Sequence, residues 1–226
     1  MIELNNVTKC FEKNQPAVLE NVSLQIQTGE YVSIMGKSGS GKSTLVSLIG
    51  GLDRPDQGTI RLFDQEITQM GDHQLALFRR QQIGFVFQAF HLISELTVLD
   101  NLTLPLGYLG YSANERKKVG LEILALIDLN GKEKLYPNQL SGGEKQRVAI
   151  GRAVIAQPNI IIADEPTGNL DETREQGTMN LLTRLNEAGK TILLVTHDQE
   201  ISQFAQRHLL IKNGKVEEYV DEKTFD

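Results

Sequence analysis

Short apolar runs recur along the chain and are separated by polar turns and amphipathic stretches. Four of the runs have the length of buried strands: Glu30–Met35, Ile83–Phe87, Ile160–Ala163 and Thr191–Thr196. The first is followed by a glycine-rich loop and by Ser43–Gly50, which we predict to be a helix. This repetition of strand, turn and helix predicts an α/β fold around a parallel sheet.

The beginning of the chain has a different pattern. Its first 28 residues resemble short strands with polar turns, and Leu19–Ile26 alternates almost regularly between apolar and polar positions. An alternating strand has one face in a core and one in water, which is typical of antiparallel sheets. We therefore expect a small antiparallel sheet beside the parallel one.

The middle of the chain predicts helices. Ser112–Leu129 carries charges on one side, and on the other side, at helical spacing, it carries Val119, Leu121, Ile123, Leu124 and Ile127. We expect 89–157 to form a mainly helical subdomain that is inserted into the α/β core. The whole chain, 1–226, is then one domain whose core consists of 1–88 and 158–226.

Composition narrows the possible functions. The chain has 226 residues, one cysteine (Cys10) and a formal net charge of -6. A single cysteine excludes an intramolecular disulfide, and an acidic balance disfavours a nucleic-acid partner. The chain has no apolar run of membrane-spanning length, and its N-terminus lacks the features of a signal peptide. We expect a cytoplasmic protein that reaches a membrane only through a partner.

The glycine-rich loop is the clearest chemical motif. Gly36–Ser43 matches G-x-x-x-x-G-K-[ST] at every fixed position, between a predicted strand and a predicted helix. Glycines let backbone N–H groups approach phosphate oxygens, and the following helix presents its positive end to them. Lys42 is expected at the β- and γ-phosphates, and the Ser43 hydroxyl is expected to ligate Mg²⁺. The predicted nucleotide-binding residues are Gly36, Lys37, Ser38, Gly39, Ser40, Gly41, Lys42, Ser43 and Thr44.

Two carboxylates follow the apolar run Ile160–Ala163. A buried strand would deliver Asp164 to the end of a parallel sheet, beside the phosphate loop, where it can hold Mg²⁺. Glu165 is the natural general base for an attacking water. The alternative is a strand that ends in a solvated acidic turn, and the phosphate loop makes that interpretation the weaker one.

Two further polar residues stand just after predicted strands. His197 follows Thr191–Thr196, and Gln88 follows Ile83–Phe87. At the edge of the sheet, His197 could act on the reacting phosphate, and the amide of Gln88 could reach both the metal and the water. From the residues alone, a structural histidine and a glutamine that merely ends a strand are equally good interpretations.

The segment Leu140–Glu144, followed by Lys145, Gln146 and Arg147, decides between families. Its serine and two glycines open a predicted helix, Glu144–Ala156, and thus form a second anion site. The segment resembles the signature motif of ABC transporter ATP-binding subunits. This resemblance covers nearly the whole chain, in the order of the family's motifs, and implies a P-loop NTPase core of the RecA-like kind.

The resemblance also assigns roles to residues. It implies that Ser141, Gly142, Gly143 and Glu144 contact ATP that is bound by a second copy of the chain. Gln88 falls at the position that senses Mg²⁺ and contacts the membrane partner, and His197 falls at the switch histidine. Phe11 stands where an aromatic ring stacks on adenine. Asn169 and Asp171, in Gly168–Asp171, are expected at the dimer interface.

The function that the resemblance implies is ATP hydrolysis coupled to transport. Two copies would close around two Mg-ATP and drive a separate integral membrane permease, from the inner face of the cell membrane. Looser segments, such as Gly50–Pro55 and Leu96–Asn101, resemble exporter ATPases of the lipoprotein-release and macrolide-export type. The alternative is an ABC-type ATPase that drives a non-transport machine, either a periplasmic one or one acting on DNA or ribosomes. The compact 89–139 stretch lacks the coiled coils or zinc modules of the DNA-acting proteins.

Overall fold

Two sheets of different kinds organise the computed structural model, which describes residues 1–11 and 16–219. The smaller sheet is antiparallel and has the order β2-β1-β4-β5. In the larger sheet, of order β10-β9-β3-β8-β7-β6, all strands are parallel except β10. The strands are β1 (Ile2–Lys9), β2 (Leu19–Ile26), β3 (Tyr31–Gly36), β4 (Gln57–Leu62), β5 (Gln65–Glu66), β6 (Ile83–Phe87), β7 (Ile160–Asp164), β8 (Thr191–Val195), β9 (Arg207–Lys212) and β10 (Lys215–Glu218).

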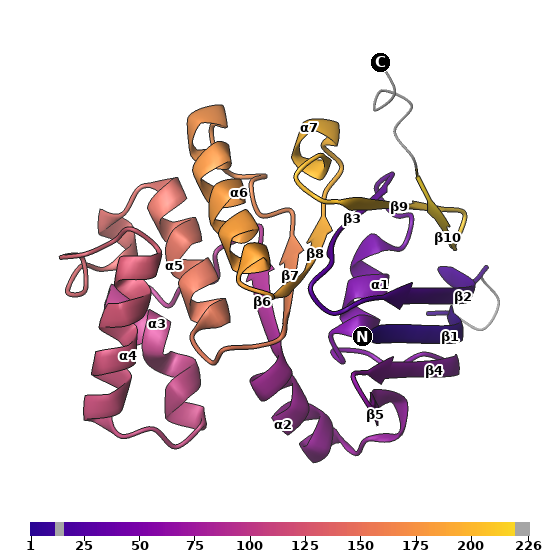
Figure 1. The fold of residues 1–226 in the computed structure, drawn as a ribbon, viewed down its shortest axis with the longest axis horizontal. Helices are drawn as coiled ribbons and strands as arrows, with labels where there is room; N and C mark the ends of the chain where they lie inside the picture. Colours follow the sequence, from indigo (N-terminus) through magenta and orange to yellow (C-terminus); the bar gives the residue numbers. More distant parts are fainter. Residues whose placement is uncertain (12–15, 220–226) are drawn as a thin grey trace.

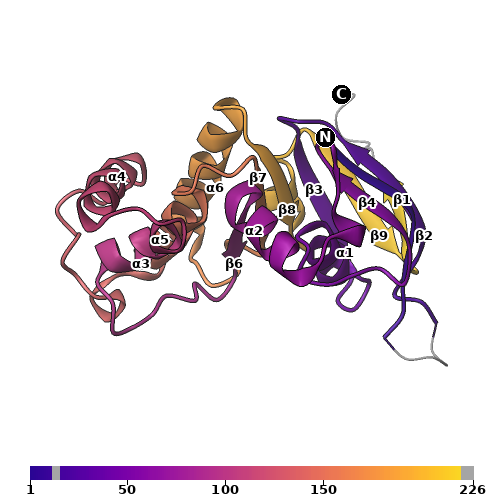
Figure 2. The same cartoon turned by 90° about the horizontal axis from the view of Figure 1, so that it is seen from below.

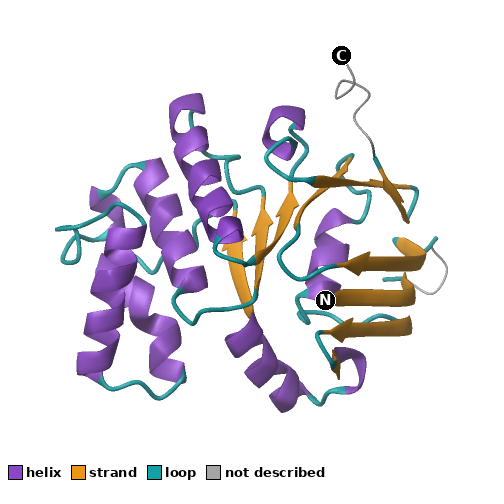
Figure 3. Cartoon of the chain, viewed as in Figure 1, coloured by secondary structure: helices purple, strands orange, loops and turns teal. Residues whose placement is uncertain are grey.

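Some helices flank the larger sheet and others form a group at one side of the molecule, and α5 belongs to both sets. Helices α3, α4 and α5 form that group, at the end opposite to the antiparallel sheet (Figures 1 and 3). Helix α1 lies between the two sheets, and α6 covers the other face of the larger one (Figure 2). The α-helices are α1 (Lys42–Ile49), α2 (Asp72–Gln82), α3 (Val98–Tyr108), α4 (Ala113–Leu126), α5 (Gly142–Val154), α6 (Glu172–Glu187) and α7 (Gln199–Ser202), with short 3-10 turns at Ile67–Gln69 and Pro137–Gln139.

The larger sheet separates two hydrophobic cores. Along β7, Ile160 and Ile162 pack into the core around α1, whereas Ile161 and Ala163 pack into the core under α5 and α6. This alternation follows from the period of two in a strand, and it explains why the central strands β6, β7 and β8 are almost entirely apolar. The carboxyl ends of β3, β6, β7 and β8 consequently meet at one edge of the sheet.

The structure agrees with most of the predicted elements. The predicted strands Leu19–Ile26 and Ile83–Phe87 are β2 and β6, and the segment between β6 and β7 contains helices and no strand. The division of the chain into 1–88, 89–157 and 158–226 stays a prediction. One detail was wrong: Leu121 is 43% exposed. It stands two positions after Val119, which is about 200° around a helix, and so it cannot share that residue's face.

A buried asparagine organises the loop that connects β6 to α3. Asn101 is fully buried, and its amide nitrogen donates to the carbonyl oxygens of Ile93, Leu96 and Thr97 at 2.9–3.0 Å. Its amide oxygen accepts the N–H of Ile93 at 2.8 Å. One side chain thus replaces the backbone partners that this irregular segment lacks.

We predict that Asn101→Ala destabilises the protein by about 3 kcal/mol, because it removes four hydrogen bonds to part-buried backbone groups of this loop. The measurement is the free energy of unfolding in urea. The matched control is Asn114→Ala on the exposed surface of α4, where a change within about 0.5 kcal/mol is expected. Equal stability of the two variants would show that Asn101 does not hold this loop.

Candidate functional site

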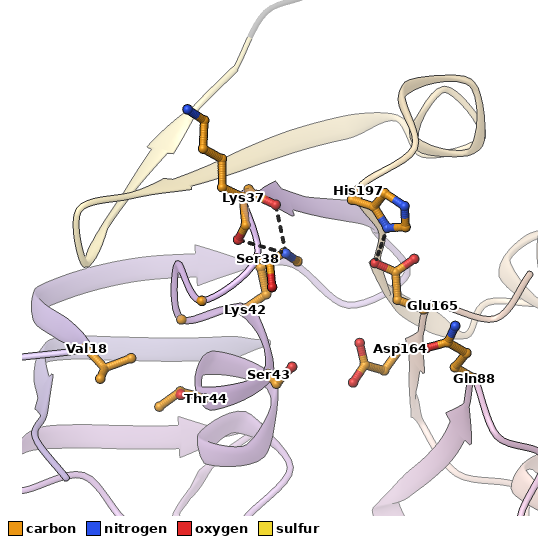
Figure 4. Close-up of a pocket in the computed structure, with 13 residues that line it drawn as sticks. Val18, Lys37, Ser38, Lys42, Ser43, Thr44, Gln88, Asp164, Glu165 and His197 are labelled. Atoms are coloured by element: carbon orange, nitrogen blue, oxygen red, sulfur yellow. Dashed lines mark hydrogen bonds and ion pairs between the residues drawn. The ribbon is translucent and has the colours of Figure 1, made fainter. Parts of the chain in front are cut away.

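A cavity of about 660 Å³ opens at the carboxyl edge of the parallel strands. Figure 4 shows its lining side chains, which come from the loop between β3 and α1 and from the ends of β6, β7 and β8. The lining residues are Val18, Gly36, Lys37, Ser38, Gly39, Gly41, Lys42, Ser43, Thr44, Gln88, Asp164, Glu165 and His197. Topology therefore brings together residues that are more than 150 positions apart in the sequence.

The phosphate loop needs glycine where the chain turns into α1. Gly41 is the N-cap of the helix and has φ of 106°, which residues with a side chain rarely adopt. A Cβ atom there would lie 2.9 Å from the carbonyl oxygen of Val18. The Lys42 ammonium donates to the carbonyl oxygens of Gly36 at 2.7 Å and of Lys37 at 3.2 Å. The loop thus wraps around the Lys42 ammonium, which is expected to contact a phosphate.

Glu165 is held in a strained position beside His197. Its φ is 48°, in the left-handed region, and its N–H donates to the carbonyl oxygen of Val195 at 2.9 Å. Such backbone strain often marks functional sites. Its Oε1 lies 2.7 Å from Nδ1 of His197 (Figure 4). The carboxylate that the sequence predicts as a general base therefore has a histidine that fixes its orientation.

Asp164 ends β7 and points into the cavity (Figure 4). Burial raises the pKa of its carboxyl group, the negative charge of Glu165 raises it further, and the Lys42 ammonium opposes both effects. A cation near Asp164 would relieve this electrostatic strain. The site thus favours a bound positive charge.

The oxygen donors around Asp164 match the predicted metal set. The hydroxyl of Ser43, the amide oxygen of Gln88 and the carboxylate of Asp164 all line the same cavity. Mg²⁺ prefers oxygen ligands and is usually bound by few protein groups together with substrate phosphates. Within 1–11 and 16–219, no group of three His, Cys, Asp or Glu side chains could hold a metal alone. This donor set fits Mg²⁺ that arrives with a nucleotide.

Gly168 packs against Gln88, and Asn169 hydrogen-bonds to it. The Asn169 side-chain amide donates to the backbone carbonyl oxygen of Gln88 at 2.9 Å. A Cβ at Gly168 would lie 2.6 Å from Nε2 of Gln88, so the two segments are packed closely. Asp171 is the N-cap of α6 and accepts the N–H of Arg174 at 3.1 Å. The roles of Asn169 and Asp171 at a dimer interface stay predictions.

The segment Ser141–Glu144 forms the beginning of α5, apart from the cavity. Ser141 is the N-cap; its N–H donates to Oε2 of Glu144 at 2.9 Å, and its Oγ accepts the N–H of Glu144 at 3.4 Å. Among the described lining residues of the cavity, none comes from this segment. A Cβ at Gly142 would lie 3.5 Å from the Leu170 side chain. The second predicted anion site therefore lies outside the lining of the first.

The structure also changes the view of two residues near the mouth of the cavity. Phe11 is 65% exposed, has the Lys9 ammonium 5.5 Å from its ring centroid and does not belong to the lining. Val18 does line the cavity, although sequence reasoning missed it because one apolar residue before a strand carries no signal. Ser40, predicted to bind nucleotide, lines a neighbouring cavity together with Lys37, Ser38 and Gly39.

Comparison with known proteins decides the family. The family model described as ABC transporter matches residues 19–168, which is well over half of the chain. The chain belongs to the ABC transporter family. The match contains the phosphate loop, Asp164 and the segment Ser141–Glu144, and it confirms the resemblance found in the sequence.

Relatives and solved structures of the family agree with this assignment. The chain is 48% identical to the macrolide export ATP-binding/permease protein MacB of Chlorobaculum tepidum, over 96% of this chain and 33% of that protein. It is 46% identical to the uncharacterized ABC transporter ATP-binding protein MJ0796 of Methanocaldococcus jannaschii, over 100% of this chain and 99% of that one. It therefore spans a third of the length of one relative and nearly all of the other.

The fold prediction is confirmed by a solved structure of the same cassette type. The dimeric post-hydrolysis structure of MJ0796, bound to ADP and Pi, has a TM-score of 0.88 and 44% identity, and the match covers 97% of this chain and 98% of that one. The P-loop NTPase core with an antiparallel sheet and a helical part is thus the architecture of this ABC ATP-binding chain. None of the helices in the described ranges is both long and apolar enough to span a bilayer.

We predict that Asp164→Asn raises the melting temperature of the nucleotide-free protein near neutral pH. The raised pKa of Asp164 means that the folded state disfavours its ionised form, so wild-type stability falls as the pH rises from the usual aspartate range (about 4) through the raised pKa. The asparagine variant cannot ionise at this position and does not lose this stability. Its melting temperature should therefore exceed that of the wild type near neutral pH and equal it in acid. Thermal unfolding across this pH range, with the exposed Asp64→Asn as a control, measures the effect. A pH-independent difference would contradict it.

Proposed function

We propose that this chain is the ATP-binding and ATP-hydrolysing subunit of a membrane transport complex, and that it works by closing as a dimer around two Mg-ATP. The observation that carries this proposal is one cavity lined by a phosphate loop, by Asp164 and by the Glu165–His197 pair. Binding and hydrolysis of a nucleoside triphosphate need these groups together.

ATP binding begins at the loop Gly36–Ser43. Its backbone N–H groups and the N-terminus of α1 receive the phosphates, and the Lys42 ammonium exchanges its loop carbonyl partners for phosphate oxygens. Ser43, Asp164 and Gln88 would hold Mg²⁺, which neutralises charge on the phosphates. Phe11 and Val18 offer apolar surface to the base and sugar, with Phe11 as the proposed adenine-stacking ring.

Hydrolysis needs a water aligned with the γ-phosphate. Glu165 accepts a proton from that water, and the contact with Nδ1 of His197 keeps the carboxylate oriented. Lys42 and the loop N–H groups stabilise the charge on the phosphate oxygens during transfer. The strained backbone of Glu165 holds its side chain at the cavity instead of letting it turn to solvent.

Dimer closure follows from where the second anion site lies. Ser141 and Gly143 open α5 outside the lining of the chain's own cavity. A second copy can bring its γ-phosphate to this helix N-terminus while its own helix serves the first copy. ATP then joins the two copies, and hydrolysis removes the phosphate that joined them.

The membrane partner is proposed to be a separate permease. The MacB relative is named as both ATP-binding protein and permease, and this chain matches a third of it. The permease would place the chain on the cytoplasmic face of the membrane, with docking near Phe90–Leu102 beside Gln88. Export of the macrolide type or lipoprotein release fits this relationship. A non-transport machine is the less favoured alternative.

We predict that Glu165→Gln lowers the rate of ATP hydrolysis roughly 10²–10⁴-fold and accumulates an ATP-bound dimer, because the amide cannot accept the proton of the attacking water. Phosphate release and size-exclusion chromatography with and without Mg-ATP measure the two effects. The control is Glu187→Gln, an exposed residue at the end of α6. Wild-type turnover in Glu165→Gln would refute the assignment of the general base.

We predict that Ile93→Asp weakens association with the permease, because it places a charge on the proposed docking segment. Ile93 is 40% exposed, and Asn101 holds its backbone. The measurement is co-purification with candidate permeases encoded beside the gene. The matched control is Leu121→Asp, which is 43% exposed on α4. Equal co-purification of both variants would place the docking surface elsewhere.

A further inference from the structure

Glu144 places a negative charge in the first turn of α5, where the proposed function requires an anion to bind. Its Oε2 accepts the N–H of Ser141 as part of a capping box. This contact stabilises the helix start, since it satisfies a backbone N–H. The same carboxylate opposes the approach of a phosphate to Gly142 and Gly143, because like charges repel.

The structure shows that this charge is balanced by a lysine from another segment. The Lys132 ammonium forms an ion pair with Oε1 of Glu144. Lys132 and the Ser141 N–H together lower the pKa of Glu144 to about 2, so its carboxylate is ionised at neutral pH. Each of the two carboxylate oxygens thus has its own partner, one on the helix and one on the loop.

Lys132 is delivered by a loop of fixed shape. Its N–H donates to the carbonyl oxygen of Leu129 at 3.2 Å, and its own carbonyl oxygen accepts the N–H of Leu135 at 3.1 Å. The loop is joined to the start of α3, where the N–H of Val98 donates to the Leu135 carbonyl oxygen at 2.7 Å. The backbone that carries Lys132 is therefore tied to α3 by hydrogen bonds.

Arg174, a second charged side chain that another segment places against this helix start, already has an acidic partner. Arg174 lies against Gly143, where a Cβ would come within 3.2 Å of its side chain. Its guanidinium pairs with Oδ2 of Asp171 at 3.1 Å. In the described contacts, the carboxylate of Glu144 is therefore balanced by Lys132 and not by Arg174.

We propose that Lys132 is a positioning residue for ATP-dependent dimerisation, which neutralises Glu144 so that the partner's γ-phosphate can bind at Ser141–Gly143. This role rests on the proposed function of the chain. It explains how an acidic residue can occupy the third position of a phosphate-binding helix. Lys132 acts through Glu144 and needs no contact of its own with the nucleotide.

The test uses compensating variants in the Glu165→Gln background, where bound ATP is not consumed. Lys132→Met should raise the dimer dissociation constant in Mg-ATP on the order of tenfold at low salt, because two unbalanced carboxylates then face two phosphates. The double variant Lys132→Met with Glu144→Gln should return within about twofold of the parent. Glutamine keeps the capping box, since its amide oxygen still accepts the Ser141 N–H.

Two controls separate electrostatics from folding. Lys134→Met removes an exposed lysine from the same loop and should leave the dimer unchanged. The loss caused by Lys132→Met should shrink at high salt, where charges are screened. Binding of a fluorescent ATP analogue to the monomer should be the same in all variants, because the chain's own cavity lies elsewhere.

The outcomes are distinct. Dimerisation of Lys132→Met equal to the parent would overturn the role of Lys132. A double variant as weak as Lys132→Met would also overturn it, because Lys132 would then act on the loop or on the nucleotide directly. A parent that binds ATP but stays monomeric at every protein concentration would refute the sandwich dimer itself, and the role of Lys132 with it.

Discussion

The parallel pairing of β3, β8, β7 and β6 is the constraint on which the rest of the structure depends. Parallel strands all end at the same edge, and in this chain each of the four ends delivers a polar group: the phosphate loop, His197, Asp164 with Glu165, and Gln88. Such a sheet is stable only when both faces are covered, because its strands are mostly apolar on both faces. Helix α1 covers one face and α5 and α6 cover the other. The two cores thus fix the positions of the four loops that follow these strands.

The unfavourable features of this arrangement lie at the carboxyl edge of the parallel sheet. Asp164 is partly buried next to another carboxylate, and Glu165 has a left-handed backbone. Both features destabilise the free protein, and both suit a site that binds a cation with a polyphosphate. The rigid sheet beneath them tolerates the strain, because Glu165 is tied by its N–H to Val195 at the end of β8.

The sequence predicted most of the residues that line this cavity, and there is a physical reason for this. The phosphate loop is continuous in sequence, and glycine and lysine have fixed functions in it, so Gly36–Ser43 could be assigned without a structure. Gln88 and His197 needed the family resemblance, because one polar residue after a strand has many explanations. The Lys132–Glu144 pair and the apolar contact of Val18 could not be predicted at all. Each depends on how a loop folds onto a distant segment, and neither has a local pattern. Leu121 was misplaced because five apolar residues were assigned to one helix face that holds only four of them.

The separation of the two anion sites determines what the chain can do alone. One cavity contains the phosphate loop, the predicted metal ligands and the proposed general base, which are the groups that we propose bind Mg-ATP. The helix start at Ser141 is not part of the lining of that cavity. The negative charge of Glu144 at this helix start is balanced by Lys132, which lies on a loop that is hydrogen-bonded to α3. Helix α3 follows the segment 93–97, which belongs to the proposed permease surface and is held by side-chain hydrogen bonds of Asn101. The surface that would meet the permease is therefore connected to the surface that would meet the second copy through the Asn101 side chain, the Val98–Leu135 backbone hydrogen bond and the Lys132–Glu144 ion pair. In this arrangement, the state of the nucleotide and the position of a membrane partner can influence each other through one small, rigid group of helices.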